Sequence, residues 1–144
     1  MQKTLITALL MAFISIGAIA QNTKPNLEHR IYPGTVTTTD GETIKGYIRN
    51  TGNENNQNKC TFYTDMDDER TKKVYKPSEL KGFSIENFQY KSMDYSGNIG
   101  LGKATRSFLF IAKPGVISMY LYFIGGEEQP VWQKGDEEPV SNAS

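Results

Sequence analysis

The sequence predicts an all-β fold: a small antiparallel barrel, roll or sandwich with one short helical turn. Three observations support this prediction. β-branched and aromatic residues recur in short runs, and turn-forming residues separate these runs at intervals of about ten residues. Almost no segment shows the hydrophobic period of a helix. A chain of 144 residues also has the length of one ordinary domain, so we expect a single core.

The first twenty residues read as a secretory signal peptide. Lys3 gives a positive start, an apolar stretch runs from Leu5 to Ile14, and Ala18-Ile19-Ala20 ends in the small residues that signal peptidase selects. The apolar stretch is too short for a membrane span. We therefore expect cleavage near Ala20, a secreted or periplasmic protein, and no transmembrane span in the mature chain.

Three segments follow from this division of the chain. Residues 1–20 form the signal peptide, residues 21–30 are polar and interrupted by Pro25, and residues 31–144 form one β-rich domain. Because proline and polar residues near a terminus favour loose structure, we expect residues 21–30 to be a flexible lead-in.

The first predicted hairpin has the clearest turn signal in the chain. Val36–Thr39 and Thr43–Ile48 are rich in β-branched residues and flank Asp40-Gly41. Asp-Gly favours a two-residue turn in which both central residues have positive φ. The Asn- and Gly-rich segment Asn50–Asn58 then predicts a loop.

A second hairpin is predicted around an acidic tip. Cys60–Thr64 pairs with Thr71–Tyr75 across the charged segment Asp65–Arg70. Pro77–Leu80 then predicts a single helical turn that Gly82 ends.

Later strands complete the predicted sheet. Phe83–Ile85 and Phe88–Tyr90 each have one alternating apolar face. Phe108–Ala112 and Val116–Ile124 are apolar on both faces and are joined by Lys113-Pro114-Gly115. A strand without a polar face is covered on both sides, so we expect this hairpin at the centre of the core. Pro130–Gln133 predicts one more strand.

The charge balance argues against a nucleic-acid partner, and the cysteine content excludes an intramolecular disulfide. The chain has 16 basic and 16 acidic residues and a formal net charge of +0 at pH 7. Nucleic acid requires a basic stripe, so we expect no nucleic-acid partner. The one cysteine, Cys60, cannot form an intramolecular disulfide, and we expect it to be a half-buried strand residue.

Two segments resemble ligand-binding loops without meeting their requirements. Gly97–Thr105 fits the phosphate-binding pattern G-x-x-x-x-G-K-[ST], except that Ala104 replaces the hydroxyl that holds magnesium. A β pattern follows instead of a helix, so we expect a glycine-rich loop that binds no nucleotide. The acidic segment Asp65–Glu69 lacks the glycine and the distal glutamate of a calcium loop, so we expect a solvated tip.

The sequence holds no complete catalytic or metal-binding constellation. His29 is the only histidine and lies in the lead-in, whereas a catalytic triad requires a rigidly oriented base. One histidine and one cysteine also cannot complete a zinc site. We therefore expect no catalytic residue, metal site or cofactor. Acid/base chemistry by two carboxylates of Glu127–Glu128 and Asp136–Glu138 remains an alternative.

Aromatic residues provide the one candidate binding site. Tyr90, Tyr120, Tyr122 and Trp132, with Tyr95 nearby, could line a ligand groove, because aromatic faces bind sugars and apolar molecules while their polar tips stay hydrated. The competing interpretation is that these rings belong to the core.

Parts of the sequence resemble a known group of proteins. Gly34–Ile48, Val74–Ile85 and Tyr90–Ser92 resemble uncharacterised exported β-rich proteins of Bacteroidota, a family of unknown function. The pattern around Asp40-Gly41, followed by Gly46 and a proline-containing turn, also resembles PRC-barrel-like domains, which are small β-barrels used in binding. These likenesses imply a β fold but no functional residue.

The hypothesis that follows is a non-catalytic binding or structural module of the cell envelope. One alternative is a carboxylate-using hydrolase of the periplasm. Another is a subunit of an outer-membrane assembly that docks through the 108–124 hairpin. The expected partner is an envelope protein, a small ligand or a second copy of the chain in a homodimer.

Overall fold

The computed structural model describes residues 24–95 and 105–141, and in these ranges it confirms the all-β fold. The strands are β1 (Ile31–Thr38), β2 (Thr43–Arg49), β3 (Cys60–Tyr63), β4 (Lys73–Tyr75), β5 (Leu80–Ile85), β6 (Phe88–Tyr95), β7 (Thr105–Lys113), β8 (Ile117–Ile124), β9 (Glu127–Lys134) and β10 (Val140–Ser141). The short helices are α1 (Asn53–Asn58), η1 (Glu69–Thr71) and η2 (Pro77–Glu79). The predicted signal peptide lies outside the described residues.

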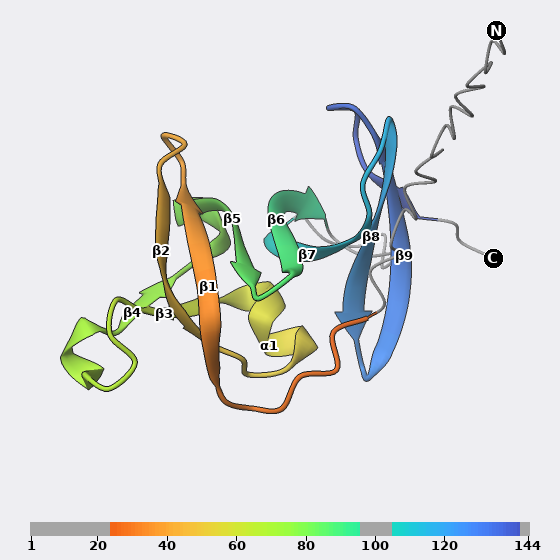
Figure 1. The fold of residues 1–144 in the computed structure, drawn as a ribbon. Coiled ribbons are helices and arrows are strands. Elements are labelled where there is room, and N and C mark those ends of the chain that lie inside the picture. Colours follow the sequence, from red (N-terminus) through yellow and green to blue (C-terminus); the bar gives the residue numbers. More distant parts are fainter. Residues whose placement is uncertain (1–23, 96–104, 142–144) are drawn as a thin grey trace, which may run out of the picture.

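All described strands belong to one antiparallel sheet. Its order is β10-β9-β8-β7-β6-β5-β1-β2-β3-β4, so two meanders are joined where β5 pairs with β1. Figure 1 shows the sheet curving, with β1 to β4 at one side, β8 and β9 at the other, and α1 between them. Because β4 and β10 stand at opposite ends of the order, the curled sheet is closest to the predicted roll.

The predicted core hairpin is apolar on both faces because it serves two clusters. On β7, Phe108 and Phe110 enter the cluster on the α1 side of the sheet, while Leu109 enters the cluster on the opposite, outer face. On β8, Leu121 enters the α1-side cluster and Tyr120 enters the outer-face cluster. The outer cluster also takes Val131 from β9, so the expectation of cover on both faces is confirmed.

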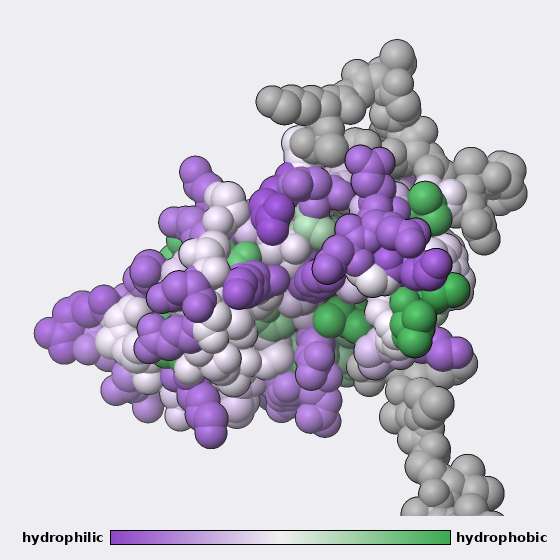
Figure 2. All heavy atoms as spheres, turned by 90° about the horizontal axis from the view of Figure 1, so that it is seen from above, coloured by the Kyte–Doolittle hydropathy of each residue, from purple (hydrophilic) through white to green (hydrophobic). Residues whose placement is uncertain are grey.

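The ends of this hairpin depart from the prediction. Val116 is 83% exposed and lies outside the strands, and Ile117 is 56% exposed. Val140 of β10 is 61% exposed. Figure 2 shows a mostly hydrophilic face with apolar side chains gathered at the end of the molecule where β8 and β9 lie. The buried core is therefore shorter than the apolar run.

The segment Asn50–Asn58 contains a helix, which corrects the predicted loop. In α1 the side chain of Gln57 is 3% exposed and pairs with one residue of β8. Its Nε2 donates to Phe123 O at 2.9 Å, and Phe123 N donates to its Oε1 at 2.6 Å. The register of β7 with β8 ends at Phe110↔Leu121, so Gln57 completes hydrogen bonds of β8 beyond that point.

The first hairpin forms where it was predicted, but its turn is different. Thr38 N donates to Glu42 O, so three residues rather than two connect the strands. Gly41 has φ 95°, whereas Asp40 is not among the described residues with positive φ. A three-residue loop with glycine in the left-handed region avoids placing an aspartate there, which explains the difference.

The helical turn that was predicted at Pro77–Leu80 forms, but Gly82 does not end it. η2 forms at Pro77, and the Glu79 carboxylate accepts a hydrogen bond from Lys76 N at 2.7 Å. Leu80 already begins β5, and Gly82 lies inside that strand, paired with Thr37 and Lys91. Glycine here permits close packing of strands instead of ending a helix.

The residues before β1 contact the domain. Pro25 is buried, Leu27 packs against the α1-side cluster, and Asn50 Nδ2 donates to Leu27 O and Glu28 O at 2.9 Å each. These contacts attach part of the predicted lead-in to the β2–α1 connection. Among the described residues, no helix has the length and apolar character required to span a membrane.

Candidate functional site: a polar groove on the outer face

A groove of about 340 Å³ lies on the outer face of the sheet, where β1, β5, β6 and β7 run side by side. Most side chains that line it are hydroxylated, amide-bearing or cationic, and the apolar side chains are those of Phe83 on β5 and Ile111 on β7. Its lining consists of Thr35, Thr37, Lys81, Gly82, Phe83, Ser84, Gln89, Tyr90, Lys91 and Ile111. This volume is at the small end of the range for small-molecule sites.

Gly82 is central to the groove. In the cross-strand register it stands between Thr37 and Lys91, so its missing side chain leaves the middle of that row open. A Cβ at this position would lie 2.3 Å from Tyr90 O, a distance that a real side chain cannot adopt. Any other residue would push β5 and β6 apart, so the glycine is required by the packing that forms the groove.

The neighbouring row supplies hydroxyl and amide groups. Thr35, Ser84 and Gln89 are cross-strand partners on β1, β5 and β6. Thr35 Oγ1 and Ser84 Oγ lie 2.8 Å apart and share a hydrogen bond. Because each hydroxyl can both donate and accept, the pair retains capacity for a polar ligand.

Lys91 is held in place at the β6 side of the groove. Its Nζ donates to Gln133 Oε1 at 3.1 Å and lies 5.8 Å from the centre of the Tyr120 ring. Tyr120 Oη is 3.3 Å from the same Gln133 oxygen, and Gln133 Nε2 donates to Glu137 O at 3.0 Å. These contacts fix the orientation of the Gln133 amide and, through it, the position of the ammonium group.

Among the residues that the structure describes, no acidic side chain lines the groove. Lys81, the second cation, lies near the first hairpin turn, where its charge contributes to the lowered pKa of Asp40, mainly a result of the hydrogen bond from Thr38. Neither Lys81 nor Lys91 has an ion pair with another described residue. The groove therefore presents positive charge beside neutral hydrogen-bonding groups.

The structure does not gather the four aromatic residues of the predicted groove. Tyr90 borders the new groove, but its ring stacks on Phe83 at a centroid distance of 4.4 Å in the α1-side cluster. Burial raises the pKa of Tyr90 to about 12, partly offset by a hydrogen bond with Asn56. Tyr120 and Tyr122 lie in the outer-face cluster.

Trp132 lies on the opposite face of β9 from that outer cluster. It pairs with Met119, whose side chain packs against the α1-side cluster, while its neighbour Val131 belongs to the outer cluster. Of the predicted aromatic set, Tyr120 is therefore the residue whose ring adjoins the cation of the groove.

Three buried polar atoms have no hydrogen-bond partner among the described residues: Tyr95 Oη, Gln129 Oε1 and Trp132 Nε1. Tyr95 contacts the Tyr122 ring edge to face at 5.0 Å, and Tyr122 is the cross-strand partner of Gln129. Tyr95 Oη and Gln129 Oε1 therefore lie on the outer face, whereas Trp132 Nε1 lies on the other face of β9. Buried polar groups are normally paired, so all three atoms are exceptions.

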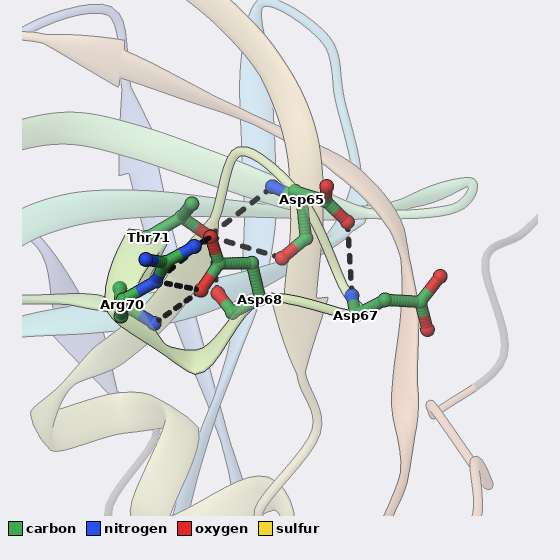
Figure 3. Close-up of polar contacts among 5 residues, drawn as sticks. All are labelled: Asp65, Asp67, Asp68, Arg70 and Thr71. Atoms are coloured by element: carbon green, nitrogen blue, oxygen red, sulfur yellow. Dashed lines mark hydrogen bonds and ion pairs between the residues drawn. The ribbon is translucent and has the colours of Figure 1, made fainter.

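Internal hydrogen bonds and one ion pair hold the acidic tip. Figure 3 shows the Arg70 guanidinium on the Asp68 carboxylate, with Nη2–Oδ2 at 2.8 Å, and the Thr71 hydroxyl against the backbone of Asp65. The Asp67 carboxylate points away from this network. Across the described residues, no group of three or more His, Cys, Asp or Glu side chains could hold a metal ion.

The other singled-out residues lie apart from the groove. His29 is exposed and lines a different cavity of about 300 Å³ with Lys24, Gly52 and Glu54. Cys60 is only 1% exposed, so it is fully rather than half buried, and burial raises its pKa. Most of Gly97–Thr105 lies outside the described residues; only Thr105, the first residue of β7, is described.

The groove was missed by the sequence analysis because its wall is divided between strands that are distant in sequence. Thr35 and Ser84 are separated by 49 positions, and each reads by itself as an ordinary solvent-facing strand residue. A usable signal was Gly82, a glycine between two strand-forming runs, since such a glycine often marks close approach of another backbone.

No family model, curated protein or solved structure matches this chain.

Proposed function

We propose that this chain is an exported, non-catalytic binding module whose outer-face groove takes a small hydroxyl-rich ligand, such as one sugar unit of a glycan. The observation that carries the proposal is the lining: paired hydroxyls at Thr35 and Ser84, the Gln89 amide and the side chain of Lys91, whose ammonium is held by Gln133. Sugars are recognised by such convergent polar groups.

The distribution of carboxylates favours binding over hydrolysis. Among the described residues every Asp and Glu side chain is exposed except Asp68, which is half-buried and paired with Arg70. A glycosidase requires a pair of carboxylates that flank the scissile bond, and none of the described carboxylates lines the groove. Glu127 and Glu128 begin β9, and Asp136–Glu138 follow it.

The assembly alternative receives less support. Val116, Ile117 and Val140 are exposed near one end of the sheet. A stable protein interface buries about 1,000 Å² or more, which three side chains of this size do not supply. We therefore base the proposed function on the groove rather than on this apolar end.

Export is proposed from the sequence of residues 1–20, with Lys3, the apolar stretch and the Ala18-Ile19-Ala20 ending. Mass spectrometry of the protein recovered from its native host provides the test. A mature N-terminus at Gln21 is expected, and a stable product that still begins at Met1 would contradict export.

Ligand binding is tested by titrating the ¹⁵N-labelled protein with methyl glycosides, both neutral and acidic, and following backbone amide shifts. We expect saturable shifts that cluster around Ser84 and Gln89. The isosteric change Thr35→Val should weaken binding because it removes one hydroxyl of the wall, whereas Thr64→Val, at an exposed position next to the acidic tip, should leave binding unchanged. If no glycoside shifts the groove amides, the proposed function is wrong.

A further inference from the structure

The positive charge of the groove indicates which hydroxyl-rich ligands it binds best. This inference rests on the proposed binding function. Lys91 is half-buried, and its ammonium has one described hydrogen bond, to Gln133 Oε1. An ammonium group has three donors. The Tyr120 ring beneath it and the Gln133 amide hold it in position, so the remaining donors are available without a large loss of side-chain freedom.

The charge of Lys91 is not balanced by a described carboxylate. The ion pairs of the described residues use other cations, and the groove lining adds Lys81 rather than an acid. Lys81 has Asp40 as an acidic neighbour, which leaves Lys91 as the cation without a counter-charge inside the groove. A partly desolvated ammonium in this position attracts an anion more strongly than a fully exposed lysine does.

The size and form of the site favour a carboxylate over a phosphate or sulfate. Within the described part of the chain, the lining has no arginine to form a bidentate fork and no residue of a helix N-terminus. A single positioned ammonium matches a single negative charge. The hydroxyls of Thr35 and Ser84 and the Gln89 amide match hydroxyls on the same ligand.

We infer that the groove selects an acidic sugar, a uronic acid unit, and that Lys91 binds its carboxylate while the Thr35–Ser84 side of the groove binds its ring hydroxyls. Free uronic acids and uronate residues of a polysaccharide present the same chemistry at this site. A monosaccharide and an oligosaccharide of the same uronic acid distinguish these two sources by their relative affinity.

The sharpest test compares two glycosides that differ in one group. Methyl β-glucuronide carries a carboxylate where methyl β-glucoside carries a hydroxymethyl group, and both are titrated against the full chain at low salt while amide shifts are followed. We expect the glucuronide to bind about tenfold more tightly. The preference should decrease as salt is raised, because screening weakens the interaction of Lys91 with the carboxylate.

Variants assign the preference to one residue. Lys91→Gln should bring the glucuronide down to the affinity of the glucoside, while Lys91→Arg should retain a preference for the acid. Lys72→Gln, an exposed position beside the acidic tip, removes the same charge elsewhere and should leave the preference intact. If Lys91→Gln does not fold, the salt dependence of the native preference and the Lys91→Arg variant remain as tests.

The outcomes separate the two proposals. Equal affinity of the native chain for the two glycosides would overturn the acidic-sugar inference and leave the binding function standing. A preference that survives Lys91→Gln would overturn the role of Lys91. Absence of binding by either sugar would contradict both the inference and the function on which it rests.

Discussion

Replacing Gln57 by alanine should destabilise the protein, because its side chain completes the backbone hydrogen bonds of a strand. The Gln57 amide is 3% exposed and closes a pair of hydrogen bonds with the backbone of Phe123. Alanine would leave a buried N–H and a buried C=O without partners. Each unsatisfied group costs about 1–3 kcal/mol, so we expect a loss of roughly 2 to 5 kcal/mol, with entry of water giving the lower value.

Urea denaturation of the native chain and of Gln57→Ala, followed by circular dichroism, measures this loss. Asn58→Ala is the matched control, because it removes an amide from the next residue of the same helix, where the side chain is exposed and donates a hydrogen bond to Glu54 O. The control should change the free energy of unfolding by no more than about 0.5 kcal/mol. Equal losses for the two variants would refute the idea that Gln57 completes the hydrogen bonding of β8.

Gln57→Glu adds a test of the hydrogen-bond geometry. A carboxylate can accept from Phe123 N but cannot donate to Phe123 O, and its charge would be buried, so its pKa should rise in the folded state. Such a group contributes stability when protonated and loses it as the pH increases. The variant should therefore gain stability, relative to the native chain, as the pH is lowered from neutral toward 5. A constant difference would contradict the assigned pairing.

Two further predictions concern the core. Phe110→Ala or Leu121→Ala should lower the free energy of unfolding by roughly 2 to 5 kcal/mol in denaturant melts, because both side chains are buried in the α1-side cluster. The exposed control Asp67→Ala should lower it little. Small effects at both core sites in a monodisperse monomer would refute the core assignment. For Tyr90, burial raises the pKa from 10.0 to about 12, so the folded state retains a proton that the unfolded state releases. Stability should therefore be intact below about pH 10 and fall as the pH rises toward 12, and Tyr90→Phe should remove that part of the fall; identical alkaline profiles would contradict the burial of the hydroxyl.

The strands and hairpins could be predicted because their signals are local. The alternating faces of Phe83–Ile85, the two-sided apolar run after Ser107 and the turn chemistry around Gly41 each depend on residues a few positions apart. These patterns determine which segments form strands and which neighbours pair in hairpins. They do not determine that β5 returns to pair with β1.

Features that depend on this long-range pairing were not predictable in the same way. The asparagine-rich segment before Cys60 has no apolar stripe that would predict a helix. Its helix is held in place by the hydrogen bonds of Gln57 with Phe123 of β8, which is 66 positions away in the sequence. The groove requires Thr35 beside Ser84, and Lys91 beside Gln133 of β9. The sequence of one strand does not indicate which distant residues will lie beside it. Polar residues on the outer face are therefore interpreted as solvent-exposed.

The pairing of β5 with β1 also determines how the chain must fold. Each meander, β1 to β4 and β5 to β10, consists of strands that are adjacent in sequence and can pair early, because hairpins form within microseconds. The seam between β1 and β5 instead joins segments separated by 49 positions at Thr35 and Ser84, and its closure must overcome chain entropy before contacts compensate for it. We expect docking of the two meanders along this seam to be the slow step, and the groove, which lies across the seam, to be absent until that step is complete.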